Sequence, residues 1–202
     1  MIASRKTPAL KTYTVAGKTL ADIHKDIQKK GPVDPNEGKR YAGSCFGMIT
    51  LGVSDTDAAH EITPESSPVE ATAQLAEGKG SVTSTPTITM PKLASDKDLS
   101  DDAKKEWKRF LGATRLHEDG HADSLYKLVV KMAGDIAGMS ATATGADEKA
   151  AKRAATKALF AKISAAYGGS TLTDMVNADI KAYDAKTSHG ASQGAVLDTS
   201  IT

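Results

Sequence analysis

The stretch RLHEDGHADSLYKLVVKMAG (115–134) decides the fold that we expect, because an apolar pattern and a polar triplet share one helical face. When each residue advances by about 100° around a helix, the mostly apolar residues of this region form one stripe: Trp107, Phe110, Leu111, Thr114, Leu125, Leu128, Val129, Met132 and Ile136. His117, Glu118 and His121 fall inside the same stripe. The pattern predicts a long helix whose polar triplet faces the interior.

Residue types at both ends of this stretch indicate where the helix begins and ends. Ser95 and Ser100 are candidate capping residues before it, and two aspartates that suit the positive end of the helix dipole follow. Glycines weaken the helix, so we expect a ragged end near Gly138. Within the helix, Asp119 and Gly120 are expected to point away from the apolar stripe.

The first half of the chain predicts a small antiparallel sheet that carries one helix. Residues alternate as in a strand at 13–17, and apolar residues recur at helical spacing over 18–30 before Gly31-Pro32 stops the helix. The remaining expected elements are two strand regions at 40–54 and 69–93, a loop at 55–68, and a hairpin turn at 77–80.

The second half predicts a helical region. An Ala-rich helix is expected at 147–169 and another at 171–186, and the residues expected to face inward on the latter are Met175, Val176, Ile180 and Tyr183. The stretches 138–146 and 167–171 are interpreted as turns between helices. We therefore predict an α+β fold in a single domain over 1–202, with a mainly β region at 12–94 and a helical, metal-binding region at 95–197.

Composition excludes several classes of protein. Lys plus Arg number 26 against 25 for Asp plus Glu, and the aromatic residues are one Trp, five Tyr and three Phe, so we expect no nucleic-acid partner. Cys45 is the sole cysteine, which excludes an internal disulfide framework and a cysteine-rich zinc finger. No apolar run has the length of a membrane span, and the N-terminal residues lack the apolar core of a signal peptide.

The sequence HEDGH (117–121) has the spacing of a helical zinc site. Histidines four residues apart on a helix direct their imidazoles to one cation, and a glutamate beside them can hold a water molecule on the metal. The competing interpretation is a pair of core-facing histidines satisfied by hydrogen bonds, although burying two His and a Glu without a cation is costly. His24 and the pair His60-Glu61 are interpreted as solvated surface residues.

Three stretches of the chain resemble a known family. EWKRFLGATRLHEDGH (106–121), YDAKTSHGASQGA (183–195) and YTVAGKTLADIHKDIQKKGP (13–32) are similar to a bacterial family of predicted secreted zinc-dependent proteases, catalogued as domain of unknown function 922. The resemblance implies a secreted or periplasmic metallopeptidase and supplies no substrate. The chain departs from the metzincin pattern, because Ser124 and Lys127 stand where that pattern has Gly and His.

Zinc on this helix needs a third protein ligand from the downstream sequence. We expect one zinc per chain, bound by His117 and His121. Asp179, Asp184 and His189 remain as candidates for the third ligand. His189 is preferred because it lies in a Gly-flanked loop that can bend toward the helix and because it belongs to the tail motif of the family.

The expected function is a zinc metallopeptidase that acts on a peptide or protein substrate. Glu118 would be the general base, Tyr183 a donor to the developing oxyanion, and Asp184 a carboxylate that orients a ligand histidine without touching the metal. Two alternatives stay open: a hydrolase of non-peptide amides or esters, and a non-catalytic protein whose zinc has four protein ligands.

Overall fold

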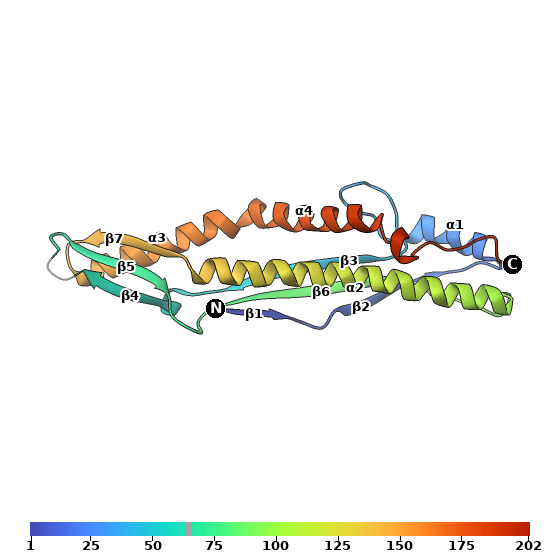
Figure 1. Cartoon of the computed structure of the whole chain (residues 1–202), viewed down its shortest axis with the longest axis horizontal. Helices are drawn as coiled ribbons and strands as arrows, with labels where there is room; N and C mark the ends of the chain where they lie inside the picture. The colour runs from blue at the N-terminus through green and yellow to red at the C-terminus, as the bar shows by residue number, and fades with distance from the viewer. Residues whose placement is uncertain (64–65) are drawn as a thin grey trace. The chain divides into compact units, whose positions relative to one another are not determined.

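The computed structural model describes residues 1–63 and 66–202 and has the predicted α+β class. The prediction of an antiparallel sheet and one helix in the first half, followed by a helical second half, is confirmed (Figure 1). The elements in chain order are β1 (Ile2–Arg5), β2 (Ala9–Val15), α1 (Leu20–Lys30), β3 (Ser44–Gly52), η1 (Asp55–Asp57), β4 (Ala58–Thr63), β5 (Val69–Leu75), β6 (Ser81–Leu93), α2 (Asp101–Ala137), β7 (Ser140–Gly145), α3 (Glu148–Tyr167), α4 (Gly169–Thr187) and η2 (Ala191–Gln193).

Contacts divide the described chain into two compact units, each of which draws residues from both halves of the sequence. The first unit consists of Met1–Lys6, Ile49–Ser84 and Tyr126–Val176, and the second of Thr7–Met48, Thr85–Leu125 and Asn177–Thr202. The expectation of one domain with a β region followed by a helical region stays a prediction.

The first unit packs a three-stranded sheet against helices. Strands β4, β5 and β7 are antiparallel, with β5 in the middle, and α3 packs on them. The buried core of this unit consists of Ala71, Ala73, Leu75, Val82, Val129, Met132, Ala133, Ile136, Ala151, Ala155, Leu159, Ile163 and Tyr167. Alanines in the sheet and along α3 let this helix lie close to the strands, and Val129, Met132, Ala133 and Ile136 of α2 belong to the same buried core.

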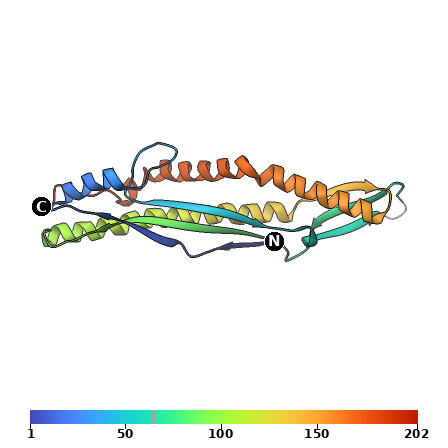
Figure 2. The same cartoon turned by 180° about the vertical axis from the view of Figure 1, so that it is seen from behind.

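The second unit holds the HEDGH stretch and has a core of its own. The buried residues are Val15, Leu20, Ile23, Ile27, Leu99, Ala103, Trp107, Phe110 and Leu197. These residues join α1, the first turns of α2 and the C-terminal segment, whose end lies beside α1 (Figure 2). The start of α2 is capped by Ser100, whose Oγ accepts from the Ala103 amide at 3.1 Å, as the sequence predicted.

Strand β6 is the centre of the second sheet. It pairs in parallel with β1 over Ser81 to Ser84 and with β2 over Thr87 to Leu93. Strand β3 also pairs with β6, and both views place it on the side of β6 opposite to β2 (Figures 1 and 2). The parallel pairs were not predicted, because they depend on contacts between segments about eighty residues apart.

Two strands occupy stretches that we expected to lack regular structure, so these expectations are wrong. The stretch 55–68 contains β4, and 138–146 contains β7. Both strands are made largely of small or polar residues, and each gains its hydrogen bonds from β5, so local hydrophobicity gave no signal. The expected hairpin at 77–80 is a turn, but it joins β5 to β6, which belong to different sheets.

Two predictions about which residues are exposed and which are buried also need correction. His60 is half-buried, and its Nε2 lies 2.7 Å from the Thr156 hydroxyl of α3, so it is not a solvated residue. On α4 the expected inward residues are only half-buried, and the buried residues are Asp184 and Thr187.

Among the described residues, no helix combines the length and apolar character that crossing a membrane requires.

A buried leucine of the first unit and an exposed leucine of the second should respond differently to substitution. Leu159→Ala removes a fully buried side chain and is expected to lower the free energy of unfolding by about 2–5 kcal/mol. Leu116→Ala, at a position 59% exposed, should change it by less than about 0.5 kcal/mol. Urea unfolding followed by circular dichroism measures both values. Equal losses would contradict the assignment of Leu159 to the core.

Candidate metal centre

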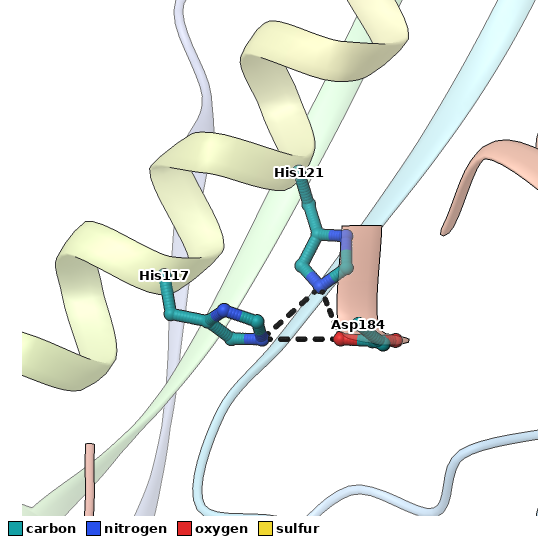
Figure 3. A group of neighbouring side chains, drawn as sticks. All are labelled: His117, His121 and Asp184. Carbon is teal, nitrogen blue, oxygen red and sulfur yellow. Dashed lines mark hydrogen bonds and ion pairs between the residues drawn. The ribbon is translucent and has the colours of Figure 1, made fainter. Parts of the chain in front are cut away.

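Helices α2 and α4 bring three ligand atoms to one point. His117 and His121 lie one turn apart on α2, and Asp184 approaches them from α4 (Figure 3). The Nε2 atoms of the two histidines are 3.2 Å apart, and Asp184 Oδ1 lies 3.2 Å from His117 Nε2 and 3.0 Å from His121 Nε2. All three residues are buried and form a group that could hold a metal ion.

The spacing of these atoms fits a tetrahedral metal. Zinc binds imidazole nitrogen and carboxylate oxygen at about 2.0–2.2 Å, so two ligands of a tetrahedral zinc lie roughly 3.3 Å apart. The three observed separations are 3.2, 3.2 and 3.0 Å. Two nitrogens and one oxygen also form a donor set that suits zinc and its neighbours among the transition metals.

A hydrogen bond from the tail fixes the orientation of His117. Its Nδ1 lies 3.0 Å from Gln193 Oε1, a carbonyl oxygen that can only accept. Neutral His117 therefore carries its proton on Nδ1 and presents the lone pair of Nε2 to the metal position. For His121 the structure provides no such partner in the described part of the chain, where its buried Nδ1 makes no hydrogen bond.

Electrostatics at the group favour a bound cation. Burial alone would raise the pKa of Asp184, but the hydrogen bonds from His117 and His121 outweigh it and hold this pKa well below its usual range. Burial alone would lower the pKa of His117, and the contacts with Asp184, Glu118 and Gln193 turn this into a net increase. Asp184 is thus a carboxylate at neutral pH, and its surroundings attract either a proton or a metal ion.

Glu118 lies beside the group without joining it. The residue is 4% exposed, and burial raises the pKa of its carboxyl to about 8. The carboxyl packs against the backbone of Gly43, just before β3, where an added Cβ would lie only 2.5 Å from Oε1. A side chain at position 43 would therefore displace the carboxyl.

The residues of the tail motif surround the three ligand atoms. Thr187 is buried next to Asp184, and its hydroxyl donates to the Tyr183 carbonyl at 2.9 Å. Gly190 adopts a φ of 80°, and an added Cβ would lie 3.0 Å from the His117 ring. Only glycine is comfortable with both the conformation and the close approach. Gln193 was not predicted as a site residue, although its place in this motif was a usable signal.

His189, the preferred third ligand, does not place a nitrogen in the group. Its Nε2 lies 3.1 Å from Glu37 Oε1, and its ring stacks on Tyr41 with centroids 4.9 Å apart. Its Nδ1 faces Asp184 Oδ1 at 3.7 Å. The group that could hold a metal therefore contains Asp184 and not His189, because α4 aims the Asp184 carboxylate at both imidazoles.

Asp179, the other candidate for the third ligand, has a partner of its own on α2. Asp179 accepts a hydrogen bond from the Ser124 hydroxyl at 2.9 Å.

Glu37 and Tyr41 were missed, because they lie in the connection between α1 and β3 and no motif singled them out. In the structure the Tyr41 hydroxyl donates to Glu37 Oε2 at 2.7 Å, so the two residues support His189 together.

Tyr183 lies over the two imidazoles. Its ring is 5.4 Å from that of His117 and 4.7 Å from that of His121, and its hydroxyl accepts a hydrogen bond from Gln193 Nε2 at 3.2 Å. The hydroxyl packs so closely against Gly120 that an added Cβ would lie 1.8 Å away. The expectation that Gly120 merely points outward is therefore wrong, because this glycine makes room for Tyr183.

Cys45 lies near Glu118 and is not part of the group that could hold a metal. Burial, followed by the nearby Glu118 charge, raises the pKa of the Cys45 thiol to about 12. A thiol with such a pKa stays protonated at neutral pH and is a poor nucleophile.

Comparison with known proteins identifies the family. The model of a family described as "Bacterial protein of unknown function (DUF922)" matches residues 10–190. The chain belongs to this family. A search of curated proteins and a search of solved structures gave no match. The family assignment agrees with the resemblance seen in the sequence, and its description carries no activity.

A pair of aspartate substitutions on α4 tests the ligand set. Asp184→Asn removes the charged oxygen and is expected to weaken zinc binding by more than about 100-fold. Asp179→Asn is the matched control, because it removes the same charge from the same helix. It should leave the affinity for zinc within a factor of about two of the parent. Competition with a zinc chelator measures both. Similar affinities in the two variants would contradict Asp184 as a ligand.

Zinc binding should also depend on pH. Burial raises the pKa of Glu118 to about 8, so at neutral pH this carboxyl holds a proton that a bound cation would displace, and the raised pKa of His117 adds to the competition between protons and the metal. Affinity is therefore expected to fall as the pH drops from 8 to 6, by about tenfold per pH unit for each displaced proton. Calorimetry in two buffers of different ionisation enthalpy counts the protons released. A pH-independent affinity would show that neither group is linked to the metal.

Proposed function

We propose that this protein is a zinc-dependent hydrolase that cleaves peptide bonds. The observation that carries the proposal is a buried His117, His121 and Asp184 group with the carboxyl of Glu118 beside it. The resemblance of the sequence to predicted secreted zinc-dependent proteases favours a peptide substrate and a secreted or periplasmic location.

The number of ligands favours a catalytic metal over a structural one. Structural zinc sites have four protein ligands, whereas catalytic sites have three and keep one position for water or substrate. Among the described residues, the group that could hold a metal contains three His, Cys, Asp or Glu side chains. The nearest further histidine, His189, has its Nε2 engaged by Glu37.

Glu118 would handle the proton in this reaction. A bound zinc would supply Lewis-acid chemistry, polarising a carbonyl and lowering the pKa of water. Glu118 would accept a proton from the attacking water and pass it to the leaving amine. Its pKa of about 8 lies close to neutral pH, and a bound cation would lower it toward the carboxylate form that acts as a base.

The remaining residues would orient the reacting groups. Gln193 holds the His117 ring by its Nδ1, and Tyr183 covers both imidazoles. The Tyr183 hydroxyl is the candidate donor to the oxyanion that develops during attack on a carbonyl. This role requires that it turn from Gln193, whose amide it contacts at 3.2 Å, toward the substrate.

Two neighbouring carboxylates provide the test of Glu118. Glu118→Gln keeps the shape but not the proton affinity, so it should retain zinc and lower kcat by at least about 100-fold. Asp119→Asn is the matched control, because Asp119 pairs with Arg115 at 2.9 Å and should keep near-normal activity. The assay uses casein, mixed peptides and chromogenic esters with added zinc.

Each outcome of this assay has a clear meaning. Loss of zinc in Glu118→Gln would make Glu118 a ligand or an essential support rather than the base. If the protein cleaves esters but no peptides, it is a hydrolase of non-peptide substrates and the proposal of a peptidase is wrong. A zinc-loaded protein with no hydrolytic activity on any of these substrates would favour a non-catalytic zinc protein.

A further inference from the structure

Strand β3 begins next to the carboxyl of Glu118. Gly43, the residue before the strand, packs against this carboxyl, and Gly47 packs against Leu125 of α2 so closely that an added Cβ would lie 1.9 Å from its Cδ2. The two glycines let the strand lie directly against the helix that carries the metal ligands. Strand β3 therefore begins beside the Glu118 carboxyl and extends away from it.

The outer edge of β3 is open in the described sheet. The strand pairs with β6, and both views place β2 on the far side of β6 (Figures 1 and 2). For residues 44–48, no backbone hydrogen bond to another segment of the described chain is present apart from the pairing with β6. A strand with an unpaired edge presents a row of amide and carbonyl groups that can bind another extended chain.

Side chains on this part of β3 alternate between two environments. Gly43 and Gly47 face α2, and Cys45 between them feels the charge of Glu118. The opposite face carries Phe46, which is 48% exposed, and Met48, which is 64% exposed. A chain added at the edge would place alternate side chains beside these two apolar residues, at cross-strand distances of about 4.5–5.5 Å.

We propose that the outer edge of β3 at residues 44–48 binds the substrate peptide as an added strand. This inference rests on the proposed function and gives it a substrate class: extended peptides with apolar side chains at alternate positions. The open edge supplies main-chain hydrogen bonds, Phe46 and Met48 supply apolar contacts, and Gly43 places the end of the bound strand at Glu118. A small ester would use none of these contacts.

The test compares two hydroxamates on the zinc-loaded chain of 202 residues. Acetohydroxamate contains only the metal-binding head group, whereas an acetylated tetrapeptide hydroxamate with alternating Leu and Ala adds an extended chain. The peptide is expected to bind at least about tenfold more tightly. Hydrogen exchange followed by mass spectrometry should show that it slows exchange of amides 44–48, and acetohydroxamate should not.

Surface variants sharpen the comparison. Phe46→Ser and Met48→Ser should each weaken the binding of the peptide hydroxamate by about fivefold or more and leave the binding of acetohydroxamate unchanged. Leu10→Ser is the matched control, because Leu10 is 58% exposed but lies on β2, and it should affect neither probe.

The outcomes separate this inference from the proposed function. If acetohydroxamate binds but the peptide gains no affinity and protects no β3 amide, the inference is wrong while the metal centre stands. If neither probe binds the zinc-loaded protein, both the proposed function and this inference are contradicted. Protection of residues 44–48 that grows with protein concentration in the absence of probe would assign the edge to a second copy of the chain and overturn the inference.

Discussion

The convergence of His117, His121 and Asp184 is the constraint on which the site depends. Two imidazole nitrogens and a carboxylate oxygen lie within 3.2 Å of one another in a buried position. Such atoms repel one another unless a positive charge lies among them, either as protons on the rings or as a metal ion. The alternative of histidines satisfied only by hydrogen bonds would require at least one ring to be charged next to Asp184.

Glycines at three close approaches allow this convergence. Gly120 makes room on α2 for the Tyr183 hydroxyl, Gly190 turns the tail against the His117 ring, and Gly43 admits the Glu118 carboxyl beside β3. None of the three is explained by flexibility alone, because in each case a Cβ would collide with a residue of the site. The site is therefore specified as much by missing side chains as by the polar groups that it contains.

Much of this arrangement could be predicted from the sequence, and the limits have physical causes. The face of α2 that carries His117, Glu118 and His121 followed from helical periodicity, because a helix is defined by local spacing. The third member of the group did not follow, because Asp184 and His189 both lie in the tail motif. Only the packing of α4 against α2 decides which of them points at the imidazoles.

Long-range pairing caused the other differences. Strands β4 and β7 carry small or polar residues and become strands through β5, and Glu37 reaches His189 from the connection after α1. Contacts of this kind leave no periodic signal in a single sequence. The family model matches residues 10–190 and carries no geometry, so the position of each side chain is seen in the structure alone.

X-ray absorption at the zinc K-edge of the zinc-loaded protein tests the central claim most directly, because it reports the ligands of the metal itself. We expect two imidazole nitrogens at about 2.0–2.1 Å, together with oxygen ligands at about 2.0–2.2 Å from Asp184 and solvent. In Asp184→Asn this spectrum should be lost or altered at equal zinc content. Three imidazole ligands would assign the third position to His189, and a shell of oxygens without imidazole would place the zinc elsewhere; either result would contradict the metal centre described for His117, His121 and Asp184.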